Sequence, residues 1–371
     1  IIPWINSKGY LLTNRFISKN NIVIDDDYVE TNCFKVRFDK HKQIVSIFDK
    51  KNNREVLKNG CVGNEIRIYA DRTDTPYDAW EWAEFSLDKY QTLDTLNSCK
   101  VVEDGARKGV RIERRYKASK IIQTIWFWDN IPKIDFDTYV DWHQQHIMLK
   151  TAFPVDINAT KATYEIQFGT LERPTHKNTS WDRSKFEVCA HKYADLSEGD
   201  YGVSLINDCK YGHDIHDGVM VLSLLRSPTH PNEVADQGEM VCSYSICPHK
   251  GQLNDSETVK YAYYLNYPLQ AVKASGNESS IPERYSAISI DKDNVICETI
   301  KESEDGADTV IRLYEYKNCR SNIKISTSIP YTKAVLCDLM ENEICELGVD
   351  NGDILTTIKG FEILTIKLKN S

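Results

Sequence analysis

The sequence contains no long apolar run, and no segment approaches the roughly 20 apolar residues that a membrane-spanning helix needs. It also lacks an excess of basic residues. Lys and Arg total 46 against 55 Asp and Glu, and the resulting net charge of −9 disfavours contact with the phosphates of nucleic acid. We therefore expect neither a membrane nor a nucleic acid among the partners of this protein.

Metal-binding and redox cysteine motifs are absent as well. The 11 cysteines are scattered and no CxxC pair occurs, so neither a zinc knuckle nor a thioredoxin-type centre is indicated. Several stand in apolar stretches, as Cys337 does in AVLCDLM, and free cysteines commonly behave as small buried hydrophobic residues. Unpaired cysteines fit a reducing compartment, so we expect a cytoplasmic protein.

The usual signatures of nucleophilic and phosphate chemistry are missing, since there is no GxSxG and no Gly-rich phosphate loop. One stretch, HDIHD, places His213 and His216 three residues apart, and on a helix these two could share a metal ion. Gly218 follows and a strand pattern begins there, so we expect a polar turn instead. No metal site is expected within the chain.

What the chain does contain is a succession of strand patterns, with almost no helical periodicity. Branched and aromatic residues alternate with polar ones, which is typical of half-buried strands. The clearest segments are residues 21–39, 43–57, 109–129, 133–142 and 218–228. The best helical candidate is short, over residues 80–93. An all-β protein is therefore predicted.

Turn residues collect in QAVKASGNESSIPERYS, near residues 270–285, and indicate a domain boundary. About seven short strand patterns follow within about ninety residues, a spacing typical of a small β-sandwich. The part before the boundary has too many strands for one small sandwich, so a large two-sheet sandwich is predicted there. We place the large domain at residues 21–272 and the small C-terminal sandwich at residues 285–371.

Three stretches combine aromatic rings with carboxylates, amides and basic groups. Carbohydrate binding uses this combination, because the apolar face of a sugar stacks on an indole ring while its hydroxyls bind planar donors and acceptors. The stretches are TPYDAWEW (75–82), TLERPTHKNTSWD (170–182) and LINDCKYG (205–212). The alternative for each is a structural loop whose polar groups bind backbone amides and whose tryptophans pack as core.

The longest group of motifs lies in residues 168–239, which contain ERPTHKNTSWD, YADLSEGDYGVSLINDCKYG, LSLLRSP and ADQGE. YDAWEW, NRFISKNNIVIDDDYVETNCFKVRFD with IVSIFDKKNNREVL behind it, IRLYEYKNCRSNIKIS and GFEILTIKL extend the pattern over nearly the whole chain. Together these motifs resemble the C-terminal β region of glycoside hydrolase family 38, the α-mannosidases, and more closely its cytosolic and bacterial branch. The resemblance implies that the large domain is a supersandwich of the galactose-mutarotase type.

The family's enzymes are retaining α-mannosidases, which need a carboxylate nucleophile and a carboxylic acid on either side of the glycosidic bond. They hold a divalent metal, usually zinc, on His and Asp ligands, and nucleophile and ligands belong to an N-terminal domain with an α/β barrel. This chain has no HxHxDxxW-type motif and no alternation of strands and helices. The resemblance therefore implies that no catalytic residue and no zinc ligand lies in this chain, and that residues 1–20 are a linker or strand from a preceding domain.

By this interpretation the chain shapes one wall of the active site, supports the catalytic barrel and is inactive alone. Its expected partners are an α-mannoside oligosaccharide, the N-terminal catalytic domain of the same polypeptide and, as a further possibility, other copies of itself. We expect the start at Ile1 to be a cut, because the first residues contain neither an initiator Met nor a signal-peptide pattern.

The resemblance also implies roles for particular residues. Arg226, in LSLLRSP, matches an arginine that reaches toward the bound sugar in related mannosidases, and strand alternation would put Leu222 and Leu224 on its face of the strand. The alternative is a surface arginine at a strand end. We expect Arg226→Ala to lower kcat/KM on an α-mannoside with little loss of folding. The candidate substrate-binding residues are Arg226, Tyr77, Asp78, Trp80, Glu172, Arg173, Trp181, Asp182, Asn207 and Asp208.

Two functions of other classes stay open. One is a free-standing carbohydrate-binding module, which would need an exposed aromatic platform. The other is a mutarotase-like aldose epimerase, which needs a general acid and a general base on either side of the ring oxygen. His176 with Glu172, or His191 with Glu187, can be nominated for that role, although no mutarotase motif accompanies either pair.

Overall fold

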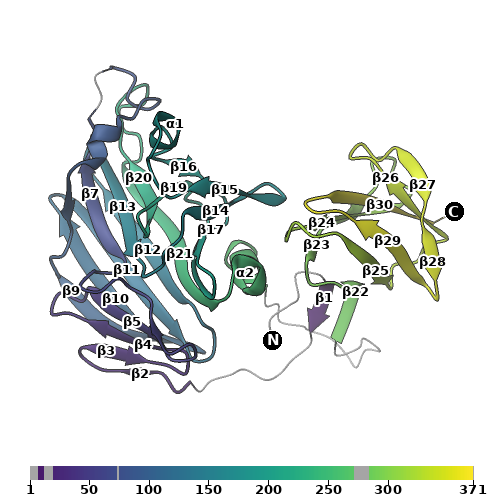
Figure 1. Cartoon of the computed structure of the whole chain (residues 1–371), viewed down its shortest axis with the longest axis horizontal. Helices are drawn as coiled ribbons and strands as arrows, with labels where there is room; N and C mark the ends of the chain where they lie inside the picture. Colours follow the sequence, from purple (N-terminus) through teal and green to yellow (C-terminus); the bar gives the residue numbers. More distant parts are fainter. Residues whose placement is uncertain (1–6, 12–19, 73–74, 271–283, 371) are drawn as a thin grey trace. The chain divides into compact units, whose positions relative to one another are not determined.

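The computed structural model of the chain describes residues 7–11, 20–72, 75–270 and 284–370. The protein divides into two compact units. The larger unit comprises residues 17–165 and 171–266, and the smaller unit comprises residues 1–16, 166–170 and 267–371. Most elements are strands (Figure 1), so the predicted all-β class is confirmed. The predicted boundary near residues 270–285 falls largely outside the described residues.

Three antiparallel sheets build the larger unit. The nine-stranded sheet has the order β15 (Gly169–Pro174), β14 (Lys161–Ile166), β17 (Tyr193–Ser197), β18 (Tyr201–Asn207), β21 (Gly238–Lys250), β12 (Ile134–Trp142), β11 (Ser119–Trp128), β10 (Arg107–Tyr116), β9 (Ser98–Asp104). The six-stranded sheet has the order β16 (Val188–Cys189), β19 (Gly212–His216), β20 (Val219–Arg226), β13 (Ile147–Pro154), β7 (Glu65–Ala70), β8 (Tyr90–Thr92). The third sheet is β2 (Val23–Ile24), β3 (Tyr28–Glu30), β4 (Phe34–Phe38), β5 (Ile44–Asp49), β6 (Arg54–Glu55).

These sheets share one hydrophobic core, and β4 shows how the sequence produces it. Phe34, Val36 and Phe38 are buried, whereas Lys35 and Arg37 are exposed. Successive side chains of a strand point to opposite faces, so an alternating sequence gives one apolar face and one polar face. The alternation in the sequence of β4 therefore explains why Phe34, Val36 and Phe38 lie in the core.

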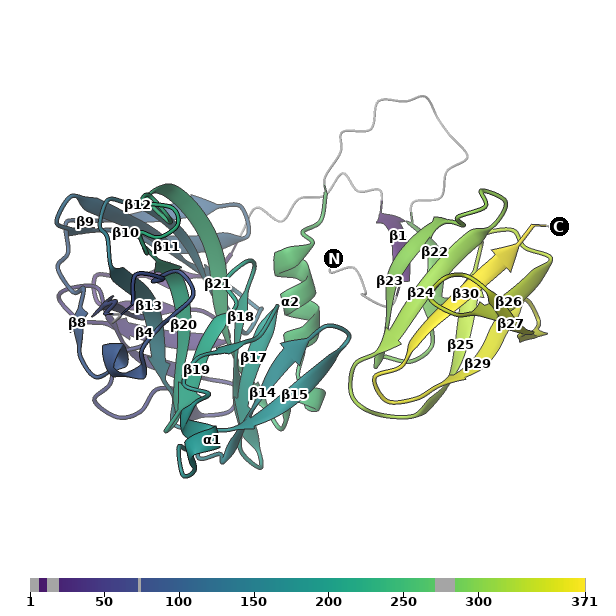
Figure 2. The same cartoon turned by 90° about the horizontal axis from the view of Figure 1, so that it is seen from above.

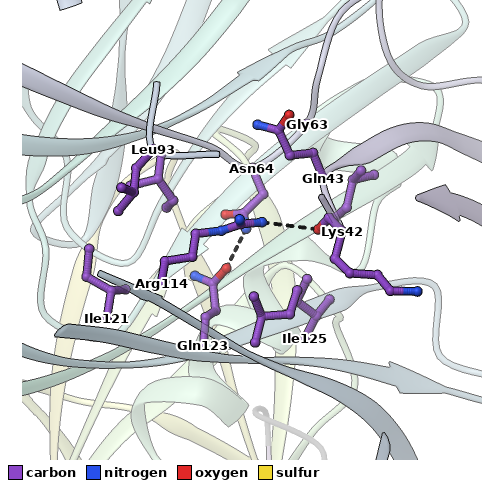
Figure 3. A pocket seen from close by; sticks show the side chains of 12 residues that line it. Lys42, Gln43, Gly63, Asn64, Leu93, Arg114, Ile121, Gln123 and Ile125 are labelled. Carbon is purple, nitrogen blue, oxygen red and sulfur yellow. Dashed lines mark hydrogen bonds between the residues drawn. The ribbon is translucent and has the colours of Figure 1, made fainter. Parts of the chain in front are cut away.

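A cavity of about 20 Å³ lies in this core and has room for about one water molecule (Figure 3). Its polar lining is internally hydrogen-bonded: Asn64 Nδ2 donates to Gln123 Oε1 at 2.5 Å, and Gln123 Nε2 donates to the Tyr244 hydroxyl at 2.7 Å. The Arg114 guanidinium donates to the backbone carbonyl of Asp94 at 2.7 Å. Because these polar groups find partners within the protein, we regard the cavity as part of the core.

The helices do not lie where the sequence predicted them. The helix expected over residues 80–93 is a 3₁₀ turn, η1 (Glu84–Leu87), followed by β8, which pairs with β7 and uses the backbone groups that a helix would need. The longest helix among the described residues is α2 (Thr258–Asn266), which buries Val259 and Ala262 and lies beside β17 and β18 (Figure 2). The other helical segments are α1 (Ser180–Arg183) and η2 (Leu253–Asp255). None of the described helices is long and apolar enough to cross a membrane.

The HDIHD stretch is the expected turn only at its last residue. His213 to His216 lie in β19, and the turn is formed by Asp217 and Gly218, whose φ values are 50° and 71°. Residues three apart on a strand point to opposite faces, so His213 and His216 cannot share a metal ion. His213 is fully buried, and burial lowers its pKa to about 4.

The smaller unit is a sandwich of two five-stranded antiparallel sheets around its own core. One sheet is β1 (Ser7–Leu11), β22 (Arg284–Ile290), β25 (Ser321–Thr327), β29 (Asp353–Ile358), β28 (Gly348–Asp350). The other is β23 (Val295–Glu302), β24 (Thr309–Glu315), β30 (Ile363–Lys369), β26 (Lys333–Cys337), β27 (Glu343–Glu346). The segment predicted as a linker or strand, residues 1–20, thus supplies an edge strand, β1, to this unit.

Candidate functional site

The candidate site lies where β20 ends at Arg226, and a β-bulge in this strand decides which way the side chain points. Ser223 and Leu225 pair with consecutive residues of β13, so Leu224 between them is left without a partner. An unpaired extra residue of this kind interrupts the two-residue alternation of a strand.

The bulge overturns one expectation about the surroundings of the arginine. Leu222 and Leu225 face the core, whereas Arg226 lies on the opposite face of the sheet together with Lys150, because cross-strand partners point the same way. The prediction that Leu222 and Leu224 share the face of Arg226 is therefore wrong. The arginine shares its face with its cross-strand partner Met148 and with the polar pair of Lys150 and Ser223.

The Arg226 guanidinium is held by a buried carboxylate. Its Nε and Nη2 atoms donate to the two oxygens of Asp71 at 2.7 and 3.2 Å, and Nη2 also donates to the backbone carbonyl of Glu81 at 2.5 Å. The Asp71 side chain is fully buried, whereas 17% of the Arg226 side chain is exposed. No hydrogen bond from Nη1 to another described residue is present, which leaves this nitrogen available to a ligand.

Asp78 fixes the loop of residues 75–82 next to the segment that follows Arg226. Its Oδ2 accepts the amide N–H of Thr229 at 2.7 Å, its Oδ1 accepts that of His230 at 2.8 Å, and His146 Nδ1 lies 3.4 Å away. Burial alone would raise the pKa of Asp78, but these donors together lower it. The carboxylate is thus kept charged and joins two loops.

Three rings form an exposed group at the same place, which we call the aromatic cluster: Tyr77, Trp80 and His230. The His230 ring centroid lies 5.5 Å from that of Tyr77 and 6.1 Å from that of Trp80. Tyr77 is 54% exposed and Trp80 is 67% exposed. Exposed rings with polar edges are the kind of surface on which a sugar stacks.

The ERPTHKNTSWD stretch ends β15 and begins α1. Thr179 caps this helix, since its hydroxyl accepts the amide N–H of Asp182 at 3.1 Å while the Asp182 carboxylate accepts the Thr179 amide and hydroxyl. The hydrogen bond from the Thr179 hydroxyl is the largest cause that lowers the pKa of Asp182. Asp182 therefore has a structural task, whereas Trp181, in the first turn, is 78% exposed.

The structure brings the segment of residues 177–186 together with the segment of residues 82–84, which contains the end of the YDAWEW stretch and the residues after it. Arg183 Nε donates to Glu84 Oε2 at 2.7 Å, and Lys177 Nζ lies 3.7 Å from the other oxygen of the same carboxylate. Just beyond α1, the Phe186 ring meets the Trp82 ring edge-on with centroids 5.5 Å apart. Two of the three polar stretches singled out in the sequence are thus connected, through Glu84 and Phe186, which lie just beyond them.

Glu172 and Arg173 have partners of their own on β14. Glu172 forms an exposed ion pair with Lys161 at 2.9 Å, and the Arg173 guanidinium lies 5.6 Å from the centre of the Tyr164 ring. Arg173 Nε is buried without a hydrogen-bond partner among the described residues. Neither side chain forms a hydrogen bond with Arg226 in the described part of the chain.

Asn207 and Asp208 lie at the end of β18, in a different sheet from β20. Asn207 is fully buried, and its side chain donates to the carbonyl of His191 and accepts the amide of Lys210, both at 2.7 Å. The Asp208 carboxylate accepts the amide of Ser243 at 3.0 Å. Both side chains serve backbone groups, so the third polar stretch does not join the first two.

The structure also locates the histidines considered for acid–base and metal chemistry. His176 lies 3.7 Å from the carboxylate of Asp182, and His191 lies 3.9 Å from that of Glu165. Within the described residues, no three His, Cys, Asp or Glu side chains are grouped in a way that could hold a metal ion. Zinc therefore does not fit the side chains described here.

Sequence reasoning missed three residues that shape this surface: Asp71, His230 and Lys150. Asp71 directly follows β7, and a polar residue at the end of a strand is a usable signal. Lys150 stands in the apolar run IMLKTAFP and is fully buried, so an unexpected charge in a strand was the available clue. His230 lies only four residues after Arg226.

The fold defines a two-unit β-sandwich protein with a polar, aromatic surface at one end of its six-stranded sheet. Comparison with known families then shows the family. The chain belongs to glycosyl hydrolases family 38: residues 29–234 match its C-terminal domain, and residues 294–366 match its C-terminal beta sandwich domain. The resemblance found in the motifs of the sequence is confirmed.

Individual relatives agree with this assignment. The chain is 33% identical over 348 residues to alpha-mannosidase 2C1 of Homo sapiens, covering 92% of this chain and 33% of that protein. It is 37% identical over 356 residues to alpha-mannosidase G of Dictyostelium discoideum, covering 91% and 32%. A crystal structure of an alpha-mannosidase from Enterococcus faecalis has the same fold, with a TM-score of 0.78 at 13% identity over 95% of this chain and 43% of that one. The chain thus spans about a third of the length of the curated relatives.

Proposed function

We propose that this chain is the C-terminal β part of an enzyme that hydrolyses α-mannosides, and that the surface around Arg226 forms one wall of its active site. The geometry of the arginine carries the proposal. Asp71 holds the guanidinium, Nη1 stays available, and the loop whose Glu81 carbonyl it binds also bears Tyr77 and Trp80 of the aromatic cluster. A fixed guanidinium suits sugar hydroxyls, and an exposed ring suits the apolar sugar face.

The carboxylates at this surface suit positioning better than catalysis. A retaining glycosidase needs two carboxyl groups about 5 Å apart across the scissile bond, one as nucleophile and one as acid. Asp71 is committed to Arg226, and Asp78 is committed to the amides of Thr229 and His230. We therefore assign the nucleophile, the acid and the zinc ligands to residues outside this chain, and expect the chain to be inactive alone.

Mannosides are the proposed substrates because the relatives covering most of this chain are named alpha-mannosidases. All 11 cysteines are free, which supports a cytoplasmic location, since a reducing compartment keeps thiols unpaired. The exposed Trp80 and Trp181 would also suit a carbohydrate-binding module, and the assay below distinguishes that function from hydrolysis.

The test is hydrolysis of an aryl α-mannoside, with added zinc or cobalt, by this chain and by the product of the complete reading frame. We expect activity only in the longer protein, because the chemical groups lie outside this chain. Activity of this chain alone would contradict the assignment of roles. If neither protein hydrolyses the mannoside but this chain binds a mannose oligosaccharide, a binding module is the better description.

In this test Arg226→Lys is a better variant than Arg226→Ala. Arg226→Ala would leave the Asp71 carboxylate buried and unpaired, which costs several kcal/mol, so we now expect this variant to lose folding stability. Arg226→Lys keeps the charge but loses the forked donors and Nη1. In the longer protein it should lower kcat/KM with a small change in Tm.

A further inference from the structure

A fully buried lysine lies under Trp82, at the end of the loop that carries Tyr77 and Trp80 of the aromatic cluster. The ammonium of Lys150 binds the carboxylate of Glu187, which also accepts a hydrogen bond from the Ser223 hydroxyl. The Trp82 ring covers the ammonium, with its centre 4.4 Å from Nζ, and the Tyr69 ring lies at 5.9 Å. We call Lys150, Glu187 and Trp82 the lysine cage.

The contacts with Glu187 and Trp82 replace the hydration that the Lys150 ammonium loses on burial. Burying a charge is unfavourable unless partners compensate it, and a cation–π contact grows stronger where water is excluded. The neighbouring strand leaves room for the carboxylate, because a Cβ atom at position 212 would come within 2.6 Å of Glu187 Oε1, and Gly212 has none. The cage is therefore a built feature of the six-stranded sheet.

The position of Trp82 depends on this cage. Its Nε1 atom is buried and has no hydrogen-bond partner among the described residues, so ring contacts with Lys150 and Phe186 hold the indole. Trp82 directly follows Glu81, whose backbone carbonyl accepts the hydrogen bond from Arg226 Nη2. Whatever fixes Trp82 also fixes the carbonyl that orients the guanidinium.

We infer that Lys150 is a positioning residue for the sugar-binding surface, acting through Trp82 and the Glu81 carbonyl on Arg226. This inference rests on the proposed function of Arg226. Lys150 and Arg226 lie on the same face of the sheet, and the lysine is too deeply buried to touch a substrate. A misplacement of about 1 Å can lower a rate about 100-fold, so loss of the cage should reduce turnover from a distance.

The test uses the product of the complete reading frame and the double variant Lys150→Met/Glu187→Gln, which removes the ion pair without leaving a buried charge. The chain offers a matched control, Lys133→Met/Asp135→Asn. Lys133 is also buried, binds Asp135 at 2.6 Å and lies 5.2 Å from the centre of the Trp128 ring, but this group belongs to the nine-stranded sheet. The measured quantities are kcat and KM for an aryl α-mannoside, and Tm.

Both double variants should lower Tm, but only Lys150→Met/Glu187→Gln should lower kcat/KM, by about 10-fold or more. Adding Arg226→Lys to Lys150→Met/Glu187→Gln should then lower kcat/KM by a smaller factor than Arg226→Lys does in the wild type, because both changes act on one guanidinium. Equal kinetics for the two double variants would overturn the inference. Wild-type kinetics for Arg226→Lys alone would instead overturn the proposed function, so the two failures are distinguishable.

A second variant serves if the double variant does not fold. Trp82→Leu removes the ring and leaves the Lys150–Glu187 pair in place. We expect it to lower kcat/KM, because the Glu81 carbonyl loses its anchor. Trp82→Leu with wild-type kcat and KM would also overturn the inference.

Discussion

Asp78 illustrates at the scale of one residue how this surface is assembled. Its two carboxylate oxygens take the amide N–H groups of Thr229 and His230, which lie about 150 positions further along the chain. The same donors that lower its pKa hold the loop of residues 75–82 against the end of β20. One charged side chain thus sets both the electrostatics and the shape of the site.

Asp78→Asn should lower the free energy of unfolding at neutral pH by about 1–3 kcal/mol, because an amide cannot accept hydrogen bonds through both of its polar atoms. The pH dependence has a definite sign. Since the folded-state pKa is lowered, the contribution of the carboxylate is complete above the unfolded-state pKa of about 3.9 and is lost as the pH falls through the folded-state pKa. Urea unfolding at several pH values should therefore show the difference from wild type shrinking in acid.

Glu172→Gln is the control for this measurement. Its carboxylate is exposed and pairs with Lys161 at the surface, so its removal should change stability by no more than about 0.5 kcal/mol. A deficit of Asp78→Asn that persists or grows toward pH 3 would contradict the assigned role of Asp78.

The sequence indicated some of these residues and could not indicate others, for a physical reason. Arg226 stood in a specific motif, and Tyr77 and Trp80 stood in a stretch whose composition suited a sugar. Asn207 and Asp208 had an equally suitable composition, yet they bind backbone groups in another sheet. The partner of a polar side chain depends on strands that are distant in the sequence, so composition alone cannot distinguish the two cases.

At the scale of elements, strands were predictable because their two-residue period is written locally, as in β4. Two features were not predictable because they depend on pairing with other strands. Residues 80–93 had the composition of a short helix, but β8 pairs with β7. The bulge at Leu224 exists only in relation to β13, and it reverses the face of Arg226.

The hairpin of β17 and β18 provides a test of packing at this scale. A Cβ atom at Gly202 would collide with the Ser197 hydroxyl and with the ring of His249, which is held by Asp195 at 2.8 Å. Gly202→Ala should therefore lower the free energy of unfolding by about 1–3 kcal/mol, as overpacking in a filled interior does. Urea unfolding monitored by tryptophan fluorescence measures this change.

Gly199 in the same hairpin is the matched control. A Cβ atom there would meet nothing within 4 Å, so Gly199→Ala should stay within about 0.5 kcal/mol of the wild type. Equal losses in the two variants would show that the space around His249 is not what limits position 202.

At the scale of the whole molecule, the protein has two hydrophobic cores, one in each unit. Six of the seven tryptophans lie between residues 80 and 181, in the larger unit, and none lies beyond residue 266. Tryptophan fluorescence therefore reports mainly on the larger unit, whereas far-ultraviolet circular dichroism reports on the strands of both.

Ile366→Ala should separate the two signals. Ile366 is fully buried in β30, and replacing a core isoleucine by alanine costs about 2–5 kcal/mol. We expect the circular dichroism transition in urea to move to lower concentration while the fluorescence transition stays in place, since each unit has its own core. Leu222→Ala, in the larger core, should shift the fluorescence transition instead. A parallel shift of both signals in Ile366→Ala would mean that the two units unfold together.

The pairing of β1 with β22 has a consequence for how shorter versions of this chain behave. β1 pairs with β22 at the edge of its sheet, and the paired residues are more than 270 positions apart in the sequence. A chain cut after residue 11 would leave the backbone N–H and C=O groups of β22 open to strands of other molecules, and such open edges promote aggregation. A shortened protein that starts at residue 29, where the family match begins, should therefore be less soluble, because the edge of β22 in its C-terminal unit would be exposed.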